Sequence, residues 1–331
     1  MKTADTLLLT RSDVAGLLSI DECIAAVENA FSAHAHGNMP APGVLGLHAA
    51  DGGLHIKASL SAPPAKYFVA KANANFPGNP KRHRLPTIQG VIIVCDAVNG
   101  KLLAVMDSIE ITIIRTGAAT GVAAKYLALP NATTATIIGC GNQGRISIKA
   151  LKAVRPIQKI FAFDTDAEQA ARLCKEFEHE LDAIPITASN MRAALSNSQV
   201  CVTCTTAKQP LLHAADIAPG TFIAAVGADN EDKNELHPDL FLTSKIVVDI
   251  LDQCARIGDL QHALKQGYIT LDGVHAALGQ VIAQQKPGRE SADEIIVFDS
   301  TGTALQDVAA AAIVYERATI NGTGTYVRFG A

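Results

Sequence analysis

The six residues from Gly139 to Gly144, with the sequence GCGNQG, constrain the fold of this chain more than any other feature. They form a G-x-G-x-x-G pattern that directly follows the apolar run TATII and directly precedes a predicted helix. In such a unit Gly139 permits a tight turn, Gly141 lets the backbone approach a pyrophosphate, and Gly144 allows close packing of helix and strand. Asn142 and Gln143 complete the loop, and the N-terminus of the helix attracts phosphate. The full context predicts a Rossmann dinucleotide site; a glycine turn without a ligand is the alternative.

Asp164 ends the next predicted strand, KIFAFD, twenty residues beyond Gly144. An acidic residue at this place binds the adenine ribose hydroxyls and repels the additional phosphate of NADP. Neither Thr165 nor Asp166 adds a positive charge, and no Arg or Lys follows immediately. The pattern predicts NAD as the cofactor, with NADH preferred and NADP possible. In the alternative interpretation Asp164 only caps the following helix, which is compatible with either cofactor.

Continuous apolar runs alternate with helical or loop segments through the rest of this region. They are VCVTCTT at 200–206, FIAAVGA at 222–228, KIVVDI at 245–250 and EIIVFDS at 294–300. Runs of this kind, separated by helices, indicate a parallel sheet covered on both faces. We therefore expect a Rossmann domain over residues 119–301.

The segment before this region has antiparallel, α+β character. Ser19 and Glu22 have capping-box spacing at the start of an amphipathic helix. Residues 67–75 are predicted to form a strand, and Asn99-Gly100 separates two apolar runs, which is a strong hairpin signal. A last helix, predicted over residues 304–319, follows the parallel sheet and is expected to return to the N-terminal domain.

The predicted fold class is therefore α/β, with a Rossmann domain and a second, discontinuous α+β domain made of residues 1–118 and 302–331. A length of 331 residues suits two domains, and 48% hydrophobic residues indicate a globular chain. The net charge of −4 gives no basic surface for nucleic acid. Seven scattered cysteines fit a reducing compartment, and no apolar run predicts a secretory leader or a membrane span. We expect a cytoplasmic protein without a membrane or nucleic-acid partner.

Three charged residues lie where packing alone would not place them. Lys71 lies inside the strand FVAKANANF, and Arg115 lies within the apolar helix ITIIRTGAAT. Cations in apolar surroundings need an anion, which is either a structural partner or the carboxylate of a substrate. Asp229 follows FIAAVGA and so lies just past the carboxyl end of a sheet strand, the edge at which open α/β sheets bind ligands. A solvated loop carboxylate is the alternative for Asp229.

Other candidates are weaker. Cys201 and Cys204 form C-x-x-C within a predicted buried strand, where alternation directs their side chains to opposite faces. The histidines have no metal-ligand spacing, so no metal site is predicted. His55 and Lys57 can point the same way from one strand, either toward a substrate or into solvent.

These stretches together resemble the ornithine cyclodeaminase/mu-crystallin family over nearly the whole chain. The matching segments are AKANANFPGN, LPTIQG, MDSIEITIIRTGAATGVAAKYLA, IIGCGNQG, VGADNEDKNEL and GRESADEIIVFDSTGTALQDV. The resemblance implies a homodimer in which the discontinuous domain binds the substrate and forms the dimer contacts. It also implies an NAD(P)-dependent oxidoreductase of amino acid metabolism.

The resemblance implies site residues as well. The carboxylate-binding Lys and Arg fall on Lys71 and Arg115, the catalytic acid on Asp229, and a pocket-lining position on Gln89. His55, which can face a substrate from its strand, is a further substrate-binding candidate. Positions implied to contact the dinucleotide, besides those of the glycine loop and Asp164, are Thr87, Thr116, Thr165, Thr205, Thr206, Val226, Gly227, Asp229, Lys233 and Ser300.

The chain departs from the cyclodeaminases of this family in two places. They have an Arg near Gly43 and an acidic residue near His55 that receives a distal amine, whereas this chain has the stretches VLGL and HIK. A basic neighbourhood disfavours the ammonium group of ornithine. We therefore predict reduction of a cyclic imino acid of the pyrroline-2-carboxylate or piperideine-2-carboxylate type to the L-amino acid. The alternatives are ornithine cyclodeaminase, alanine dehydrogenase and a non-catalytic, mu-crystallin-like binding protein, in that order.

Asp164 leads to a prediction on cofactor choice. NADH is expected to bind more tightly than NADPH, and Asp164→Ser is expected to narrow the difference because it removes the charge that repels the 2′-phosphate. Fluorescence titration of both variants with both cofactors measures this. A clear preference of the unmodified chain for NADPH would contradict it and would indicate an overriding basic group.

Overall fold

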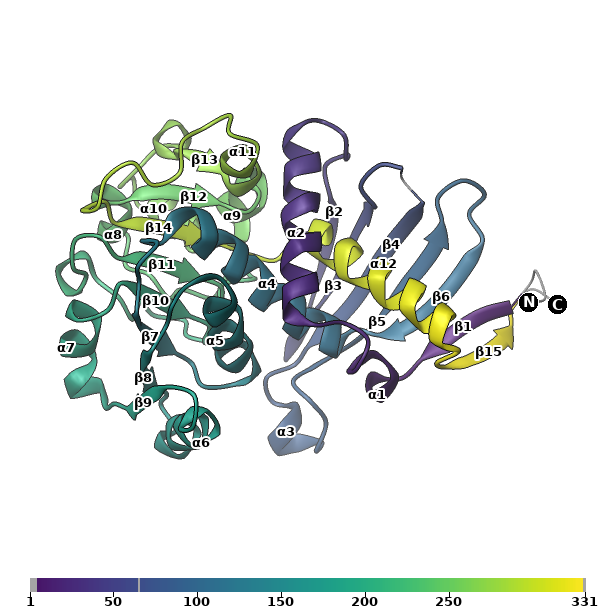
Figure 1. Ribbon diagram of the computed structural model, residues 1–331, viewed down its shortest axis with the longest axis horizontal. Helices are drawn as coiled ribbons and strands as arrows, with labels where there is room; N and C mark the ends of the chain where they lie inside the picture. The colour runs from purple at the N-terminus through teal and green to yellow at the C-terminus, as the bar shows by residue number, and fades with distance from the viewer. Residues whose placement is uncertain (1–4, 65, 330–331) are drawn as a thin grey trace. The chain divides into compact units, whose positions relative to one another are not determined.

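The computed structural model describes residues 5–64 and 66–329, which divide into two compact units (Figure 1). Unit 1 takes residues 1–115 and 303–331, and unit 2 takes residues 116–302. The boundary between residues 115 and 116 falls inside one helix, α4 (Ile109–Leu127). Unit 1 is therefore assembled from the two ends of the chain.

Unit 1 contains a seven-stranded sheet with the order β15-β1-β6-β5-β4-β3-β2. Neighbouring strands are antiparallel except β1 and β6, which are parallel. The strands are β1 (Asp5–Leu9), β2 (Gly43–Ala49), β3 (Gly52–Leu60), β4 (Tyr67–Asn75), β5 (Ile88–Asp96), β6 (Leu102–Asp107) and β15 (Thr325–Arg328). The described helices that lie wholly in this unit are α1 (Arg11–Val14), α2 (Ile20–Ala35), α3 (Asn79–Arg82) and α12 (Ala304–Asn321).

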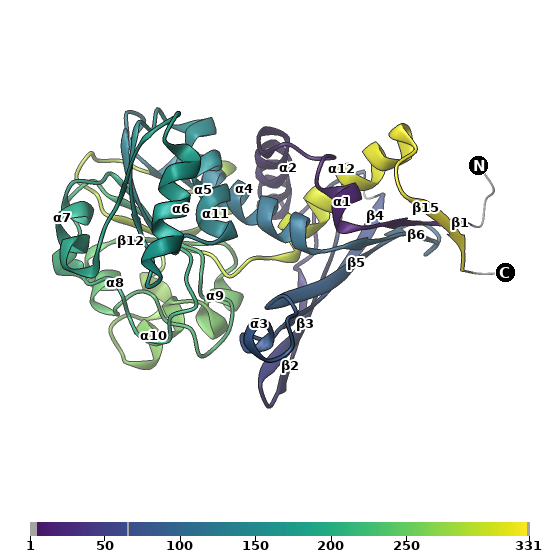
Figure 2. The same cartoon turned by 90° about the horizontal axis from the view of Figure 1, so that it is seen from below.

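Two long helices cover one face of this sheet. The predicted capping box is confirmed at the start of α2, where the Ser19 hydroxyl accepts the Glu22 amide and the Glu22 carboxylate accepts the Ser19 amide. Val27 and Phe31 on α2 are buried, as is Val314 on α12. Helix α12 packs against α2 and against strands β3, β4 and β5, and Figure 2 shows both helices on the same side of the sheet. The N-terminus of α12 is thereby placed over β3 and β4.

Unit 2 contains an eight-stranded, wholly parallel sheet with the order β13-β12-β14-β11-β10-β7-β8-β9. Strands β10, β11 and β14 are buried along their whole length, as expected when helices cover both faces. The α/β prediction with a Rossmann domain is confirmed. The strands are β7 (Thr134–Ile138), β8 (Lys159–Phe163), β9 (Asp182–Pro185), β10 (Val200–Thr203), β11 (Phe222–Ala225), β12 (Lys245–Val248), β13 (Ala276–Ala277) and β14 (Ile296–Asp299).

Seven short or medium helices complete the α-helical part of unit 2. They are α5 (Asn142–Val154), α6 (Ala167–Phe177), α7 (Met191–Ser196), α8 (Asp239–Thr243), α9 (Leu251–Ile257), α10 (Leu260–Lys265) and α11 (Leu278–Ile282). Strand order reverses at β7, which pairs with β8 on one side and with β10 on the other. In an open parallel sheet the crevice at such a reversal, outside the carboxyl ends of the strands, is the place for a ligand.

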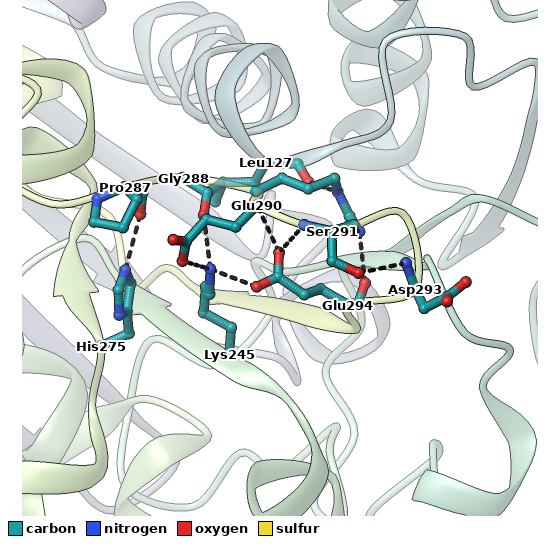
Figure 3. A network of polar contacts seen from close by, with 10 residues as sticks. Leu127, Lys245, His275, Pro287, Gly288, Glu290, Ser291, Asp293 and Glu294 are labelled. Carbon is teal, nitrogen blue, oxygen red and sulfur yellow. Dashed lines mark hydrogen bonds and ion pairs between the residues drawn. The ribbon is translucent and has the colours of Figure 1, made fainter.

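A polar network fixes the segment that leads into β14 (Figure 3). The Lys245 ammonium, at the start of β12, donates to the Gly288 carbonyl at 2.8 Å and contacts Glu290 at 2.8 Å and Glu294 at 2.6 Å. The Glu294 carboxylate also accepts the backbone amides of Glu290 and Ser291. These contacts lie at the amino-terminal edge of the sheet, the edge opposite the crevice, so the first part of the GRESADE run has a structural role.

The sequence analysis missed four strands, β1, β2, β13 and β15, of which β13 is only two residues long. All seven residues of β2 and all four of β15 are exposed, so neither carries the alternation of apolar and polar residues that identifies a half-buried strand. No helix within the described residues is both long enough and apolar enough to cross a membrane.

Candidate active site

The glycine loop of unit 2 has the geometry that a pyrophosphate requires. Gly139 has φ +101°, a conformation that side chains rarely adopt, and a Cβ on Gly144 would lie 2.2 Å from the Gly139 carbonyl oxygen. A Cβ on Gly141 would meet nothing within 4 Å, so open space lies in front of this residue. Helix α5 begins directly afterwards, at Asn142, without a side-chain cap on its first amides. These residues fit the pyrophosphate of a dinucleotide.

Asp164 contacts this loop rather than capping the next helix. One carboxylate oxygen accepts the Cys140 amide at 2.8 Å, and the other accepts the Asp166 amide at 3.0 Å. The N-cap of α6 is Asp166, whose side chain accepts the Glu168 amide. The alternative interpretation of Asp164 as a helix cap is therefore wrong. Thr165 is exposed beside it.

The predicted dinucleotide residues of unit 2 collect at the carboxyl edge of the sheet. Thr205 and Thr206 follow β10, Val226 and Gly227 follow β11, and Ser300 follows β14. A Cβ on Gly139 would lie 2.9 Å from the Cys204 carbonyl oxygen, so the loops after β7 and β10 are in contact. Thr116 is buried on α4. Thr87 belongs to unit 1, where its carbonyl accepts the Phe76 amide ahead of β5.

Asp229 and Lys233 form an ion pair in the loop after β11. The Lys233 ammonium lies 2.7 Å from an Asp229 carboxylate oxygen and donates to the Gly227 carbonyl at 3.0 Å. The Asp229 side chain is 40% exposed, against 12% for Lys233. Lys233 thus stabilises the loop from its buried side, and the Asp229 carboxylate is partly accessible to a reactant.

Glu235 lies at the end of the same loop, and the sequence analysis did not identify it as a site residue. It is fully buried, and its two carboxylate oxygens accept the Thr205 amide at 2.6 Å and the Gly227 amide at 2.9 Å. A solitary Glu in the run KNEL carries no local pattern that would identify it.

Unit 1 brings Lys71 and Arg115 together around a third residue, Asp307. The Lys71 ammonium and the Arg115 Nε lie 2.7 Å and 3.0 Å from the same Asp307 oxygen, and all three side chains are at least 92% buried. An Arg115 Nη donates to the Gln306 side-chain oxygen at 2.8 Å. A structural ion pair, one of the two partners expected for these cations, is therefore present. Asp307 and Gln306 were not predicted as site residues, although the closing run TALQD contains both.

A third buried cation, Lys57, also acts on the Asp307 carboxylate. Lys57 on β3 is buried and pairs across the sheet with Lys71 on β4, so both side chains share one face. Burial, together with the neighbouring Arg115, lowers the pKa of Lys71 to about 7, despite Asp307. Burial alone would raise the pKa of Asp307, but Lys71 and Arg115 more than offset it, and this pKa lies below its ordinary value. Three cations thus act on one carboxylate, an arrangement suited to a second anion.

The remaining substrate-side candidates lie on different faces. His55 lies two residues before Lys57 on β3 and so shares the face of Lys57 and Lys71. Gln89 lies on β5, where Ile92 is the register partner of Lys71. Alternation therefore places Gln89 on the opposite face, beside Val91 in an open apolar hollow. The structure separates Gln89 from the two cations.

One group of potential metal ligands, His213, His237 and Asp239, occurs within the described part of unit 2. Their ligand atoms lie within 4.8 Å of one another. The two imidazole rings are stacked, with centroids 4.3 Å apart and planes inclined by 29°. The His237 Nδ1 accepts the Asp239 backbone amide at 3.3 Å, which occupies one of the ring lone pairs, and we assign no metal to this group.

Comparison with known proteins identifies the family. The model of the ornithine cyclodeaminase/mu-crystallin family matches residues 4–322. The chain belongs to this family. An alanine dehydrogenase of Archaeoglobus fulgidus is 40% identical over 329 residues, covering 98% of this chain and 99% of that protein.

Solved structures of the ornithine cyclodeaminase/mu-crystallin family share the whole fold. An archaeal alanine dehydrogenase dimer with bound NAD has a TM-score of 0.94 at 38% identity, covering 98% of this chain and 99% of that one. The Δ1-pyrroline-2-carboxylate reductase of Thermococcus litoralis, in complex with NADH and L-proline, has a TM-score of 0.92 at 33% identity, covering 97% and 100%. The chain is therefore an enzyme of a family of NAD(P)-dependent oxidoreductases and cyclodeaminases, as predicted.

The shared Asp307 leads to a prediction on stability. Asp307→Asn keeps the shape but leaves the buried Lys71 and Arg115 without their anion, so the free energy of unfolding is expected to fall by about 3–5 kcal/mol. Urea denaturation measures this. The matched control is Asp51→Asn, which breaks an exposed pair with Arg82 and is expected to change stability by no more than about 1 kcal/mol. Equal effects of the two substitutions would contradict the assigned role of Asp307.

Proposed function

We propose that the enzyme uses NADH to reduce the C=N bond of a small imino acid, with a cyclic imino acid of the pyrroline-2-carboxylate or piperideine-2-carboxylate type as first choice. The observation that carries the proposal is the group of buried cations Lys71, Arg115 and Lys57 that act on the single carboxylate of Asp307, a place suited to a substrate carboxylate. The glycine loop and Asp164 support the choice of a dinucleotide as the cofactor. The named ligands of the Thermococcus litoralis relative, NADH and L-proline, agree with this reaction.

The roles of the side chains follow from their chemistry. The glycine loop and Asp164 would hold the dinucleotide, which when bound would supply the hydride for the imine carbon. Arg115 and Lys71 donate charge-assisted hydrogen bonds to the carboxylate and so fix the orientation of that carbon. Asp229 delivers a proton to the nitrogen, directly or through water, and Lys233 holds the loop that presents it.

The basic surroundings of Lys71 favour a substrate without a distal cation. Lys57 shares its face of the sheet, and His55 lies on that face two residues before Lys57. An ammonium group brought into buried, positively charged surroundings lacks a counter-charge, which typically costs several kcal/mol. A flat cyclic imine carries no such group. Alanine dehydrogenation is the second candidate because of the 40% identical Archaeoglobus fulgidus relative.

We propose that the active form is a homodimer built on the face of the unit 1 sheet opposite to Lys71. Five large apolar side chains on this face are between 44% and 60% exposed: Leu45 and Leu47 on β2, Leu54 and Ile56 on β3, and Val91 on β5. They border a hollow of about 500 Å³. An exposed apolar surface of this kind marks an interaction site, and a relative with the same fold is a dimer.

From the sequence, we also propose that the protein is located in the cytoplasm.

A substrate panel tests the proposed reaction. The purified enzyme is expected to oxidise NADH with pyrroline-2-carboxylate or piperideine-2-carboxylate, and to release little ammonia or proline from ornithine with NAD. Asp229→Asn is the matched variant: it is expected to bind NADH but to lose turnover by about 10²–10⁴-fold, because an amide cannot deliver the proton. Faster turnover of ornithine, or of alanine with NAD, would replace the proposed reaction by the corresponding alternative. NADH binding without turnover of any of them would favour a binding protein.

The lowered pKa of Lys71 leads to a prediction on pH. Lys71 binds a carboxylate only when it is protonated, so KM for the imino acid is expected to rise above pH 7, by up to about tenfold for each pH unit. In Lys71→Arg the cation remains protonated and this rise is expected to disappear. Initial rates between pH 6 and pH 9 measure both. The same rise of KM in both variants would show that another group titrates.

A further inference from the structure

We propose that Glu235 is a positioning residue, whose carboxylate joins the loop after β10 to the loop after β11 and so holds Thr205 and Asp229 in place for catalysis. The catalytic part of this inference rests on the proposed function. Glu235 acts through the two loops, since both of its oxygens are occupied by their backbone amides.

The geometry of Glu235 is that of a bridge. One oxygen accepts the amide of Thr205, two residues beyond β10, and the other accepts the amide of Gly227, two residues beyond β11. The side chain is fully buried, so water does not compete for these amides. A Cβ on Gly227 would lie 2.4–2.6 Å from the Glu235 carboxylate, so the close approach requires a glycine.

Two further buried carboxylates hold Glu235 itself. Asp259, at the start of α10, accepts the backbone amides of Glu235 and Leu236 at 2.6 Å and 3.0 Å. Asp299, at the end of β14, in turn accepts the amides of Asp259 and Leu260. Each acid therefore fixes the backbone that carries the next, from β14 to the two loops. Burial, and for Glu235 and Asp299 also the charge of Asp259, raises the pKa of all three groups.

The two loops that Glu235 joins contain several of the predicted site residues of unit 2. The first carries Thr205 and Thr206, and the second carries Val226, Gly227 and Asp229. Within the second loop, Lys233 already fixes Asp229 relative to Gly227. Glu235 adds the connection to the neighbouring strand, which sets the position of Asp229 relative to Thr205.

Glu235→Gln is the decisive variant, because it keeps the shape but places an NH2 group opposite one of the two amides. One loop then loses its acceptor. We expect kcat per NADH-binding site to fall at least tenfold, whereas KM for the imino acid changes less than threefold because Lys71 and Arg115 are untouched. Hydrogen–deuterium exchange of peptides covering residues 203–209 and 226–232 is expected to accelerate at least tenfold.

Glu294→Gln is the matched control. Glu294 also accepts two backbone amides in unit 2, those of Glu290 and Ser291, but at the opposite edge of the sheet (Figure 3). This variant is expected to accelerate exchange around residues 288–294 and to leave kcat within twofold of the unmodified enzyme. An equal loss of kcat in both variants would identify general destabilisation and overturn the proposal.

Two outcomes separate this inference from the proposed function. If Glu235→Gln folds with unchanged kcat and unchanged exchange, the inference on Glu235 is overturned while the proposed reaction stands. If the unmodified enzyme reduces no imino acid, the proposed reaction fails, and faster exchange with weaker NADH binding in Glu235→Gln still supports the bridge. Should Glu235→Gln not fold, Glu235→Asp tests the same point, because the shorter carboxylate reaches only one loop and is expected to lower kcat likewise.

Discussion

The contact of Asp307 with both Lys71 and Arg115 determines how unit 1 is assembled. The three residues come from β4, α4 and α12, so segments from near the two ends of the chain must meet before any of these charges is balanced. Burying a charge without a partner is costly, and this contact therefore ties the C-terminal helix to the N-terminal sheet. The same contact gathers buried cations at one place, so one arrangement both completes the fold and provides positive charge that an anion would need.

Unit 2 meets a different requirement, the placement of several loops at one sheet edge. Gly139 and Gly144 let the backbone of the first loop approach its neighbours closely. The next two loops are fixed by carboxylates that accept backbone amides, with Glu235 nearest to the site. In each case the backbone is the partner, which leaves the outward-facing groups of these loops available to a cofactor and a reactant.

The parts of this enzyme that sequence reasoning found are those specified locally. The glycine pattern, the capping box at Ser19 and the hairpin at Asn99-Gly100 each depend on a few consecutive residues, and all three were predicted correctly in type. Lys71 and Arg115 stood out because a cation interrupts an apolar run. Asp307 and Glu235 could not be found in this way, because their partners lie 236 and 30 residues away and only the fold brings them together. The side of the sheet on which Gln89 lies was likewise decided by strand register.

Asp164 holds the glycine loop through the Cys140 amide and also stands where the ribose is expected. One side chain thus serves both a structural and a selective purpose, which restricts the paths by which cofactor choice can change in evolution. A substitution that admits a 2′-phosphate also removes an acceptor from the phosphate loop. A lineage moving toward NADP would have to acquire another acceptor for the Cys140 amide first, so the order of mutations matters as much as their identity.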